Sequence, residues 1–165
     1  MSGAGMPELG TAELLAQVEA EERELVFETF TRDDAWRLGT RLRAAAAERG
    51  LPIVIGITVG GQRLFAAALD GATPDNDAWL ERKTRATLHY QRSSLGVGEQ
   101  FRARGWTFES HSRLDPDEIA GNGGVLPITV AGVGVVGAVG VSGLPQLDDH
   151  AFVVEQLRGF LRERD

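Results

Sequence analysis

The sequence predicts an α+β fold, in which an antiparallel sheet of about five strands is flanked by helices. Two β-rich runs, residues 52–58 and 63–69, are separated by Gly60-Gly61, which suits a tight hairpin turn. A third run, 125–142, is an uncharged glycine–valine segment long enough for a second hairpin. Strands joined by tight turns are antiparallel, and segments with helical periodicity surround these hairpins.

The first fifty residues predict two helices with a short strand between them. Residues 1–10 are expected to be a disordered leader, and 11–165 a single domain. Residues 11–24 carry a narrow apolar stripe at helical spacing, and 25–30 is a candidate strand. Thr31 is a good N-cap for the second helix. Gly50 and Pro52 are expected to end this helix.

The middle of the chain predicts two helices and a strand. Asn76 or Asp77 is expected to cap a helix that reaches residue 90, and Ser93 or Ser94 to begin a shorter helix that ends near residue 105. Residues 106–110 are expected to form a strand, and 115–124 a loop.

In the glycine–valine hairpin, small and large side chains alternate. One face is expected to present valines to the core, and the other to be nearly bare, so that a helix, another subunit or a flat ligand can approach the backbone. The predicted core face holds Val133, Val135, Val139 and Val141, and the bare face holds Gly134, Val136, Ala138, Gly140 and Ser142. After the hairpin, Asp148 or Asp149 is expected to cap the last helix.

Composition excludes several classes of function. The chain has no cysteine, which excludes disulfides and thiolate sites and fits a cytoplasmic protein. Its net charge is −7, and residues 1–30 hold seven glutamates and one arginine, which argues against nucleic-acid binding. A membrane span needs about 20 apolar residues, and Pro127 and several glycines interrupt the one apolar run, so no membrane partner is expected.

Gly132, Gly134 and Gly137 spell the dinucleotide-binding pattern GxGxxG. That pattern binds a pyrophosphate only where it closes a strand and opens a helix. The residues that follow, AVGVSGLP, cannot form a stable helix, so a hairpin is the better interpretation.

A predicted basic stripe lies on the helix at residues 77–92. Arg82, Arg85, His89 and Arg92 are three or four residues apart and share one face, with Lys83 beside them. Such a stripe suits carboxylates or phosphates. The alternative is a solvated face on which Glu81 pairs with Arg85.

The three histidines, His89, His111 and His150, lack the spacing of a metal site. Each is more typical of a surface or capping residue, and no Ser-His-Asp order is supported by flanking motifs.

Several short motifs occur together in a fixed order across residues 12–162. They are NDAWLERK at 76–83, RSS at 92–94, LDP at 114–116, GGVLPI at 123–128, GVSGL at 140–144 and DH at 149–150. In these motifs the chain resembles the haem-degrading domain family, which includes the GlcG- and HbpS-like proteins, and it is most similar to a branch of uncharacterised proteins.

The resemblance implies a profilin-like α/β/α sandwich that assembles with itself as a dimer or a larger ring. Some members bind haem, and some are linked to haem breakdown, glycolate use or cobalamin-related operons. Relatives usually carry a histidine where this chain has Asn122, and asparagine neither titrates nor binds ferric haem well.

The expected ligand site combines these motifs with the glycine loop. Arg82 and Lys83 are expected to pair with a ligand carboxylate, and the amides of Gly123 and Gly124 to hold an anion. If haem is the cofactor, His150 is the first candidate for its axial ligand and His89 the second. The full set of predicted ligand-binding residues is Asn76, Trp79, Arg82, Lys83, Ser94, Asn122, Gly123, Gly124, Ser142, Asp149 and His150.

The sequence supports three hypotheses for function. The preferred one is a homo-oligomeric protein that binds a small anionic molecule, with haem as one candidate. The second is an enzyme of haem or glycolate metabolism, which needs a titratable group in the pocket. The third is a structural protein whose bare hairpin face builds an oligomer.

Overall fold

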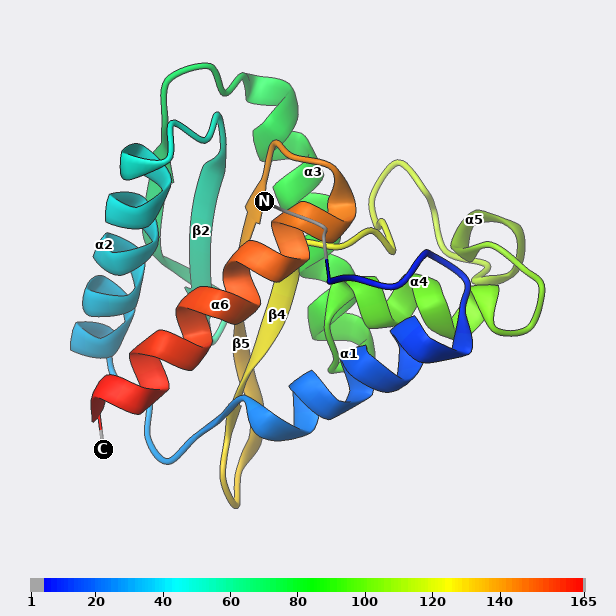
Figure 1. Ribbon diagram of the computed structural model, residues 1–165, viewed down its shortest axis with the longest axis horizontal. Helices are drawn as coiled ribbons and strands as arrows, with labels where there is room; N and C mark the ends of the chain where they lie inside the picture. The colour runs from blue at the N-terminus through cyan, green and yellow to red at the C-terminus, as the bar shows by residue number, and fades with distance from the viewer. Residues whose placement is uncertain (1–4, 165) are drawn as a thin grey trace.

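The fold is an α+β sandwich built on one five-stranded sheet with the strand order β1-β4-β5-β2-β3 (Figure 1). The structure, a computed structural model, describes residues 5–164. The strands are β1 Val26–Phe27, β2 Val54–Val59, β3 Gln62–Ala68, β4 Val125–Val130 and β5 Gly134–Ser142. The helices are α1 Ala12–Glu24, α2 Arg32–Glu48, α3 Pro74–Tyr90, α4 Ser94–Arg102, α5 Phe108–His111 and α6 Gln146–Arg164.

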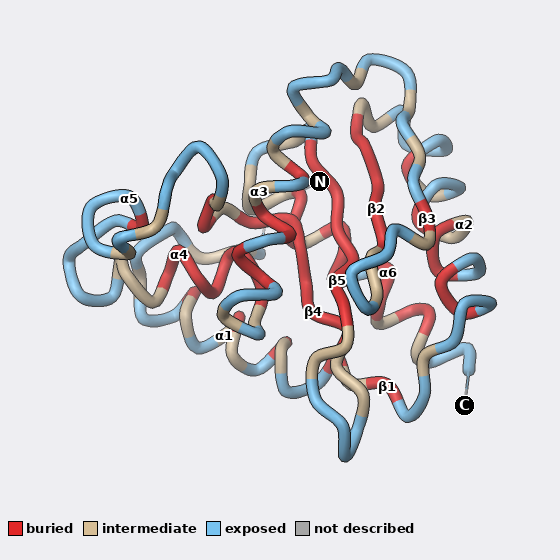
Figure 2. The backbone as a smooth tube through the Cα atoms, turned by 180° about the vertical axis from the view of Figure 1, so that it is seen from behind, coloured by how far each residue is buried: buried red, intermediate tan, exposed pale blue. Residues whose placement is uncertain are grey.

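Helices cover both faces of the sheet. The main core lies between the sheet and the pair α2 and α6, where Leu42 and Leu157 meet Ile55 and Val139. On the opposite face, Leu80 of α3 packs against Val54, Val125 and Ala138. Figure 2 shows that the central strands are buried along most of their length, whereas the connecting loops are exposed.

Several local predictions are confirmed. Thr31 caps α2 through a capping box with Asp34. Gly60 and Gly61 both have positive φ, 59° and 78°, as a two-residue hairpin turn requires. The short predicted strand at 25–30 contains β1, which pairs in parallel with β4 and is joined to it by a long connection, as parallel strands require.

The N-terminal leader lies partly outside the described residues, which begin at residue 5. Within the described part, Met6 packs against the cluster of Leu14, Val18 and Leu95. The backbone N–H of Gly10 donates a hydrogen bond to Glu99 Oε1 at 2.7 Å.

Three element boundaries differ from the prediction. α3 begins at Pro74 with Thr73 as its N-cap, and Asn76 is the third helical residue, whose Oδ1 accepts from the Thr73 N–H. The predicted strand at 106–110 is wrong, because Thr107 and Ser110 form a capping box that begins α5. α6 begins at Gln146, so Asp148 and Asp149 lie in its first turn and do not cap it.

The predicted alternation along β5 holds only in its second half. Ile128 pairs with Gly137 and Thr129 with Val135, so the pairing shifts by one residue at Val136. Val136 therefore packs against the main core, whereas Val133, predicted to be in the core, is 72% exposed.

Helix α3 covers the middle of the bare face of β5, which is one of the three alternatives that the sequence left open. Leu80 of α3 packs against Ala138. A Cβ added at Gly140 would lie 2.6 Å from the carbonyl oxygen of Gly124 and 2.8 Å from the Cα of Val125. Glycine at 140 is thus required by the neighbouring strand β4.

We expect Gly140→Ala to lower the free energy of unfolding by about 1–3 kcal/mol, because the methyl group overlaps backbone atoms that cannot move freely. Ala66→Val is the matched control, since Ala66 is exposed on edge strand β3 and should change stability by less than about 0.5 kcal/mol. Chemical denaturation measures both, and equal stability of the two variants would contradict the packing described.

Candidate functional site

The elements α3, β5, α6 and the loop at 121–124 surround a pocket of about 300 Å³. This volume is at the lower end of the range for small-molecule sites. Seven of the predicted ligand-binding residues line it: Asn76, Trp79, Lys83, Asn122, Gly123, Ser142 and Asp149. The other lining residues are Asp75, Gly143, Leu144 and Gln146.

Local structure explains how these side chains converge. Trp79 and Lys83 are four residues apart on α3 and so share the face that packs on β5. Gln146 and Asp149 lie three apart in the first turn of α6, whose N-terminus points toward the loop. Gly123 permits this approach, because a Cβ there would lie 2.4 Å from the Gln146 carbonyl oxygen.

A buried ion pair forms the floor of the pocket. Lys83 Nζ donates to Asp149 Oδ2 at 3.2 Å, to the Gly123 carbonyl at 3.0 Å and to the Val141 carbonyl at 2.9 Å. Asp149 also accepts the backbone N–H groups of Gly143 and Leu144. Both side chains are at most 3% exposed.

Burial shifts the pKa of both partners toward the neutral form. It lowers the pKa of Lys83, and the nearby Asp149 carboxylate opposes the shift. Burial raises the pKa of Asp149 to about 6, against the opposing effects of Lys83 and two backbone N–H groups. The Asp149 carboxyl therefore holds a proton at a higher pH than an exposed aspartate does.

The ammonium group of Lys83 has three N–H donors, and all three are used within the chain. Arg82, the other cation predicted to hold a carboxylate, stacks on Trp79 with its guanidinium carbon 4.0 Å from the ring centroid. It does not line the pocket. In this conformation neither cation offers a free donor to a ligand in the pocket.

Neutral donors remain available in the pocket. Among the described residues, the side chains of Asn122 and Ser142 form no hydrogen bond, and neither do the amide nitrogen of Asn76 and the indole nitrogen of Trp79. Gln146 Oε1 accepts the Gly123 N–H at 3.0 Å, which leaves its amide nitrogen free as well. The pocket thus presents several neutral N–H and O–H donors to a ligand that can accept hydrogen bonds.

The predicted basic stripe does not continue to Arg92, because α3 ends at Tyr90 and Gln91 adopts a left-handed conformation. Two of the predicted stripe cations pair with acidic residues outside α3. Arg92 binds Glu22 of α1 at 3.1 Å, and Arg85 approaches Glu118 at 3.7 Å. The predicted pairing of Glu81 with Arg85 is wrong, because Glu81 accepts instead from Arg63 of β3 at 2.8 Å.

Besides Arg82 and His150, three more of the predicted site residues lie outside the pocket lining. Ser94 is buried, and its hydroxyl bonds the backbone N–H and carbonyl of Val125. Gly124 has a φ of 139° and leaves no room for a Cβ beside Lys83 Nζ. His89, the second haem-ligand candidate, is exposed on α3, where its ring lies 4.8 Å from that of Tyr90.

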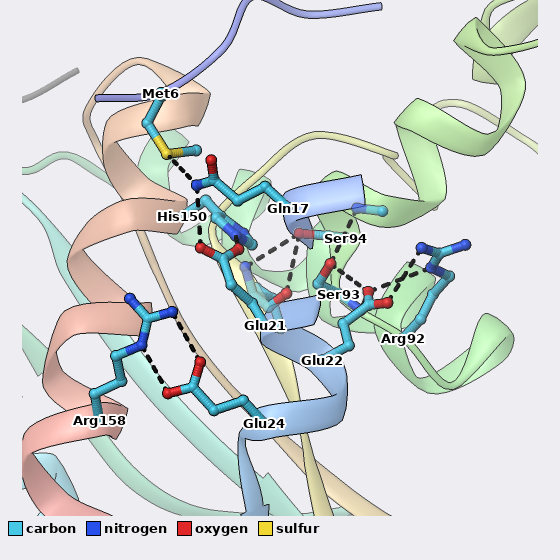
Figure 3. Close-up of polar contacts among 12 residues, drawn as sticks. Met6, Gln17, Glu21, Glu22, Glu24, Arg92, Ser93, Ser94, His150 and Arg158 are labelled. Carbon is cyan, nitrogen blue, oxygen red and sulfur yellow. Dashed lines mark hydrogen bonds and ion pairs between the residues drawn. The ribbon is translucent and has the colours of Figure 1, made fainter. Parts of the chain in front are cut away.

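His150, the first haem-ligand candidate, has no exposed surface and does not line the pocket. Its Nε2 lies 2.7 Å from Glu21 Oε1, and Gln17 in turn donates to Glu21 and to the Met6 sulfur (Figure 3). Nδ1 is buried and has no partner among the described residues. Haem ligation by His150 would require this cluster to open.

The pocket residues do not fit a haem. Proteins hold haem iron through histidine, cysteine, methionine or tyrosine side chains. None of the described residues that line the pocket is of these types. The donor set favours a small ligand that is not coordinated through a metal.

Two further properties concern the described part of the chain. Between residues 5 and 164, no helix combines the length and apolar character needed to cross a membrane. The same residues contain no cluster of three or more side chains suited to hold a metal ion.

Sequence reasoning missed Gln146, Gly143, Leu144 and Asp75. Gln146 follows Pro145, and proline often precedes or begins a helix, so Gln146 could have been placed in the first turn of α6. No local signal shows that this turn faces the 121–124 loop.

Comparison with known proteins finds a match over most of the chain. The family model described as haem degrading protein HbpS-like matches residues 30–158. The UPF0303 protein of Streptomyces coelicolor is 57% identical over 93% of this chain and 97% of its own length. The UPF0303 protein of Streptomyces avermitilis is 53% identical over 94% and 96%.

Solved structures share the fold. The crystal structure of the Ybr137w protein has a TM-score of 0.83 and 32% identity, covering 91% of this chain and 88% of its own. HbpS itself has a TM-score of 0.63 at 20% identity, covering 80% and 89%. The PduOC:heme complex has a TM-score of 0.63 at 16% identity, covering 80% and 94%. At these low identities, the similarity to HbpS and to the PduOC protein shows only a shared fold.

We expect Lys83→Met to lower the free energy of unfolding by about 3–5 kcal/mol, because it leaves the Asp149 carboxylate buried without its counter-charge. Arg85→Met is the matched control. It removes an exposed partner of Glu118 and should cost less than about 1 kcal/mol. Urea denaturation compares the two, and equal losses would show that the buried pair does not stabilise the site.

The raised pKa of Asp149 predicts that the free energy of unfolding depends on pH. The carboxyl loses its proton near its ordinary pKa of 3.8 in the unfolded chain, but near 6 in the folded protein. Between these values the folded state binds more protons, so raising the pH lowers the free energy of unfolding. The stability of the wild type minus that of Asp149→Asn should therefore fall from about pH 4 to about pH 6 and then level off. A difference that rises with pH would contradict the raised pKa.

Proposed function

The chain belongs to the HbpS-like family, and we propose that it binds a small molecule rich in hydrogen-bond acceptors, such as a carboxylate, in the pocket between α3 and α6. One observation carries this proposal. The pocket gathers several neutral donors that have no partner among the described residues, above a lysine whose charge Asp149 already balances.

A carboxylate suits this arrangement for three reasons. Its oxygens can accept from the side chains of Asn122 and Ser142, both of which line the pocket. The N-terminus of α6 points at the same space, and helix N-termini favour anions. The half-buried indole of Trp79 supplies an apolar wall for the rest of the ligand.

In this proposal, the buried ion pair of Lys83 and Asp149 holds the neighbouring donor groups of the pocket in position. Lys83 holds the Gly123 carbonyl and the end of β5, so the Asn122 and Ser142 side chains are fixed relative to each other. Preorganised donors lose less entropy on binding than mobile ones.

Haem is not part of this proposal. The PduOC protein was crystallised with heme, yet at 16% identity its heme cannot be assigned to this chain. The small pocket and the absence of an axial ligand type among its described residues favour a smaller molecule.

We expect calorimetric titration with a panel of small carboxylates, including glycolate, succinate and benzoate, to identify a ligand. Ser142→Ala and Asn122→Ala should each weaken its binding about 10- to 100-fold, because each removes one hydrogen bond to a charged group. Native mass spectrometry of protein purified without added ligand checks independently whether such a molecule is retained.

Ser110→Ala is the matched control, since Ser110 is an exposed serine outside the pocket. Equal affinities for Ser142→Ala and Ser110→Ala would contradict the proposed site. Hemin is titrated in parallel, and a Soret shift that His150→Ala or His89→Ala abolishes would restore haem as the ligand.

A further inference from the structure

Lys83 is the only lysine among the 17 lysine and arginine residues of the chain. Its side chain is 3% exposed, and it lines the pocket between α3 and α6. A lysine amine can lose its proton and act as a nucleophile, whereas an arginine guanidinium stays charged. Nucleophilic chemistry by a lysine side chain is therefore confined to this pocket.

Burial brings the charged and the neutral forms of the Lys83–Asp149 pair closer in free energy. It lowers the pKa of Lys83 and raises the pKa of Asp149 to about 6. The proton has a direct route, since Nζ donates to Asp149 Oδ2 at 3.2 Å. Passing that proton to the carboxylate thus costs less here than between an exposed lysine and an exposed aspartate, and it produces a neutral amine.

The surroundings of Nζ can accommodate this neutral amine. It keeps two N–H groups, which are enough for the carbonyl groups of Gly123 and Val141 at 3.0 and 2.9 Å. Its lone pair takes the place of the N–H that Asp149 accepted, and so points toward a residue that itself lines the pocket. A ligand that meets this carboxyl group therefore also meets the lone pair.

We propose that Lys83 Nζ forms an imine with the carbonyl carbon of a 2-oxo acid bound in this pocket, and that Asp149 moves the protons. The imine rests on the proposed function, because the neutral donors of Asn122 and Ser142 hold the carboxylate of the same ligand. A 2-oxo acid carries its carbonyl group next to its carboxylate, so both groups fit within about 300 Å³.

The reaction conserves charge within the buried pair. Lys83 first passes a proton to Asp149, and its lone pair then attacks the carbonyl carbon of the ligand to form the N–C bond. The carbonyl oxygen takes the proton from Asp149 and becomes a hydroxyl group. Asp149 next removes one proton from the nitrogen and gives it to the hydroxyl group, which leaves as water while the C=N bond forms. The product iminium carries one N–H and one positive charge, so the Asp149 carboxylate keeps its counter-charge.

Reductive trapping tests for the imine directly. Sodium cyanoborohydride near neutral pH reduces an iminium formed with pyruvate to a stable secondary amine. The adduct adds the mass of pyruvic acid less one oxygen atom, which intact-mass spectrometry measures. Peptide mapping then assigns it to Lys83 or to the α-amino group of the chain. We expect an adduct at Lys83 in the folded protein.

Arg85→Lys supplies the matched control, because Arg85 is exposed on the same helix and does not line the pocket. In that variant Lys83 should be modified at least about tenfold faster than the new lysine, since each unit by which a pKa is lower gives tenfold more neutral amine. Lactate is the matched ligand, because it carries a hydroxyl group where pyruvate has its carbonyl group. It should bind in calorimetry and form no adduct.

The outcomes separate the imine from the proposed function. Binding of pyruvate and lactate without an adduct at Lys83 would overturn the imine and leave the carboxylate pocket standing. An adduct at the α-amino group alone, or at Lys83 only after unfolding in guanidinium chloride, would also overturn the imine. An adduct at Lys83 that Asn122→Ala and Ser142→Ala do not slow would support the imine and contradict the proposed carboxylate donors.

Discussion

The buried pair of Lys83 and Asp149 holds together the parts of this protein that form its pocket. Lys83 comes from α3 and Asp149 from α6, and the lysine also bonds the 121–124 loop and the end of β5. Burying two charges is costly, and the cost is offset only where every donor and acceptor finds a partner. Here the three N–H groups of Lys83 and two backbone N–H groups meet that condition.

This constraint shapes what the pocket can bind. All three N–H groups of Lys83 are already used, so the free donors among the described pocket residues are neutral amide, indole and hydroxyl groups. Such donors suit a ligand that accepts hydrogen bonds, and the ligand need not be highly charged. The membership of the HbpS-like family gives the chain its scaffold. Function still depends on the residues of the site, among them Asn122.

α6 connects the different parts of the molecule. Its inner face, with Val153 and Leu157, packs in the main core, and its first turn supplies Asp149 to the pocket. The buried His150 contacts Glu21 and so ties α6 to α1.

Short-range signals predicted most of the fold. Capping residues such as Thr31 and the glycine pair at 60–61 act on neighbours within a few residues, so the sequence alone is enough to place them. The prediction of a strand at 106–110 was wrong because two local signals conflict there. The capping box formed by Thr107 begins a short helix and outweighs a weak β pattern. The motifs at 76–83, 122–124 and 142 likewise identified most of the pocket lining before any geometry was known.

The sequence by itself determined the α+β class, the hairpins, the helix caps and the identity of most pocket residues, because these follow from local conformational preferences and from short motifs. Only the tertiary structure decided what those residues do. The bulge at Val136 arises from the pairing of β5 with β4, and Lys83 is saturated because residues 40 to 66 positions away fold around it. Contacts at such separations depend on which elements pack together, and hydrophobic periodicity marks the buried face of each element without identifying its partner.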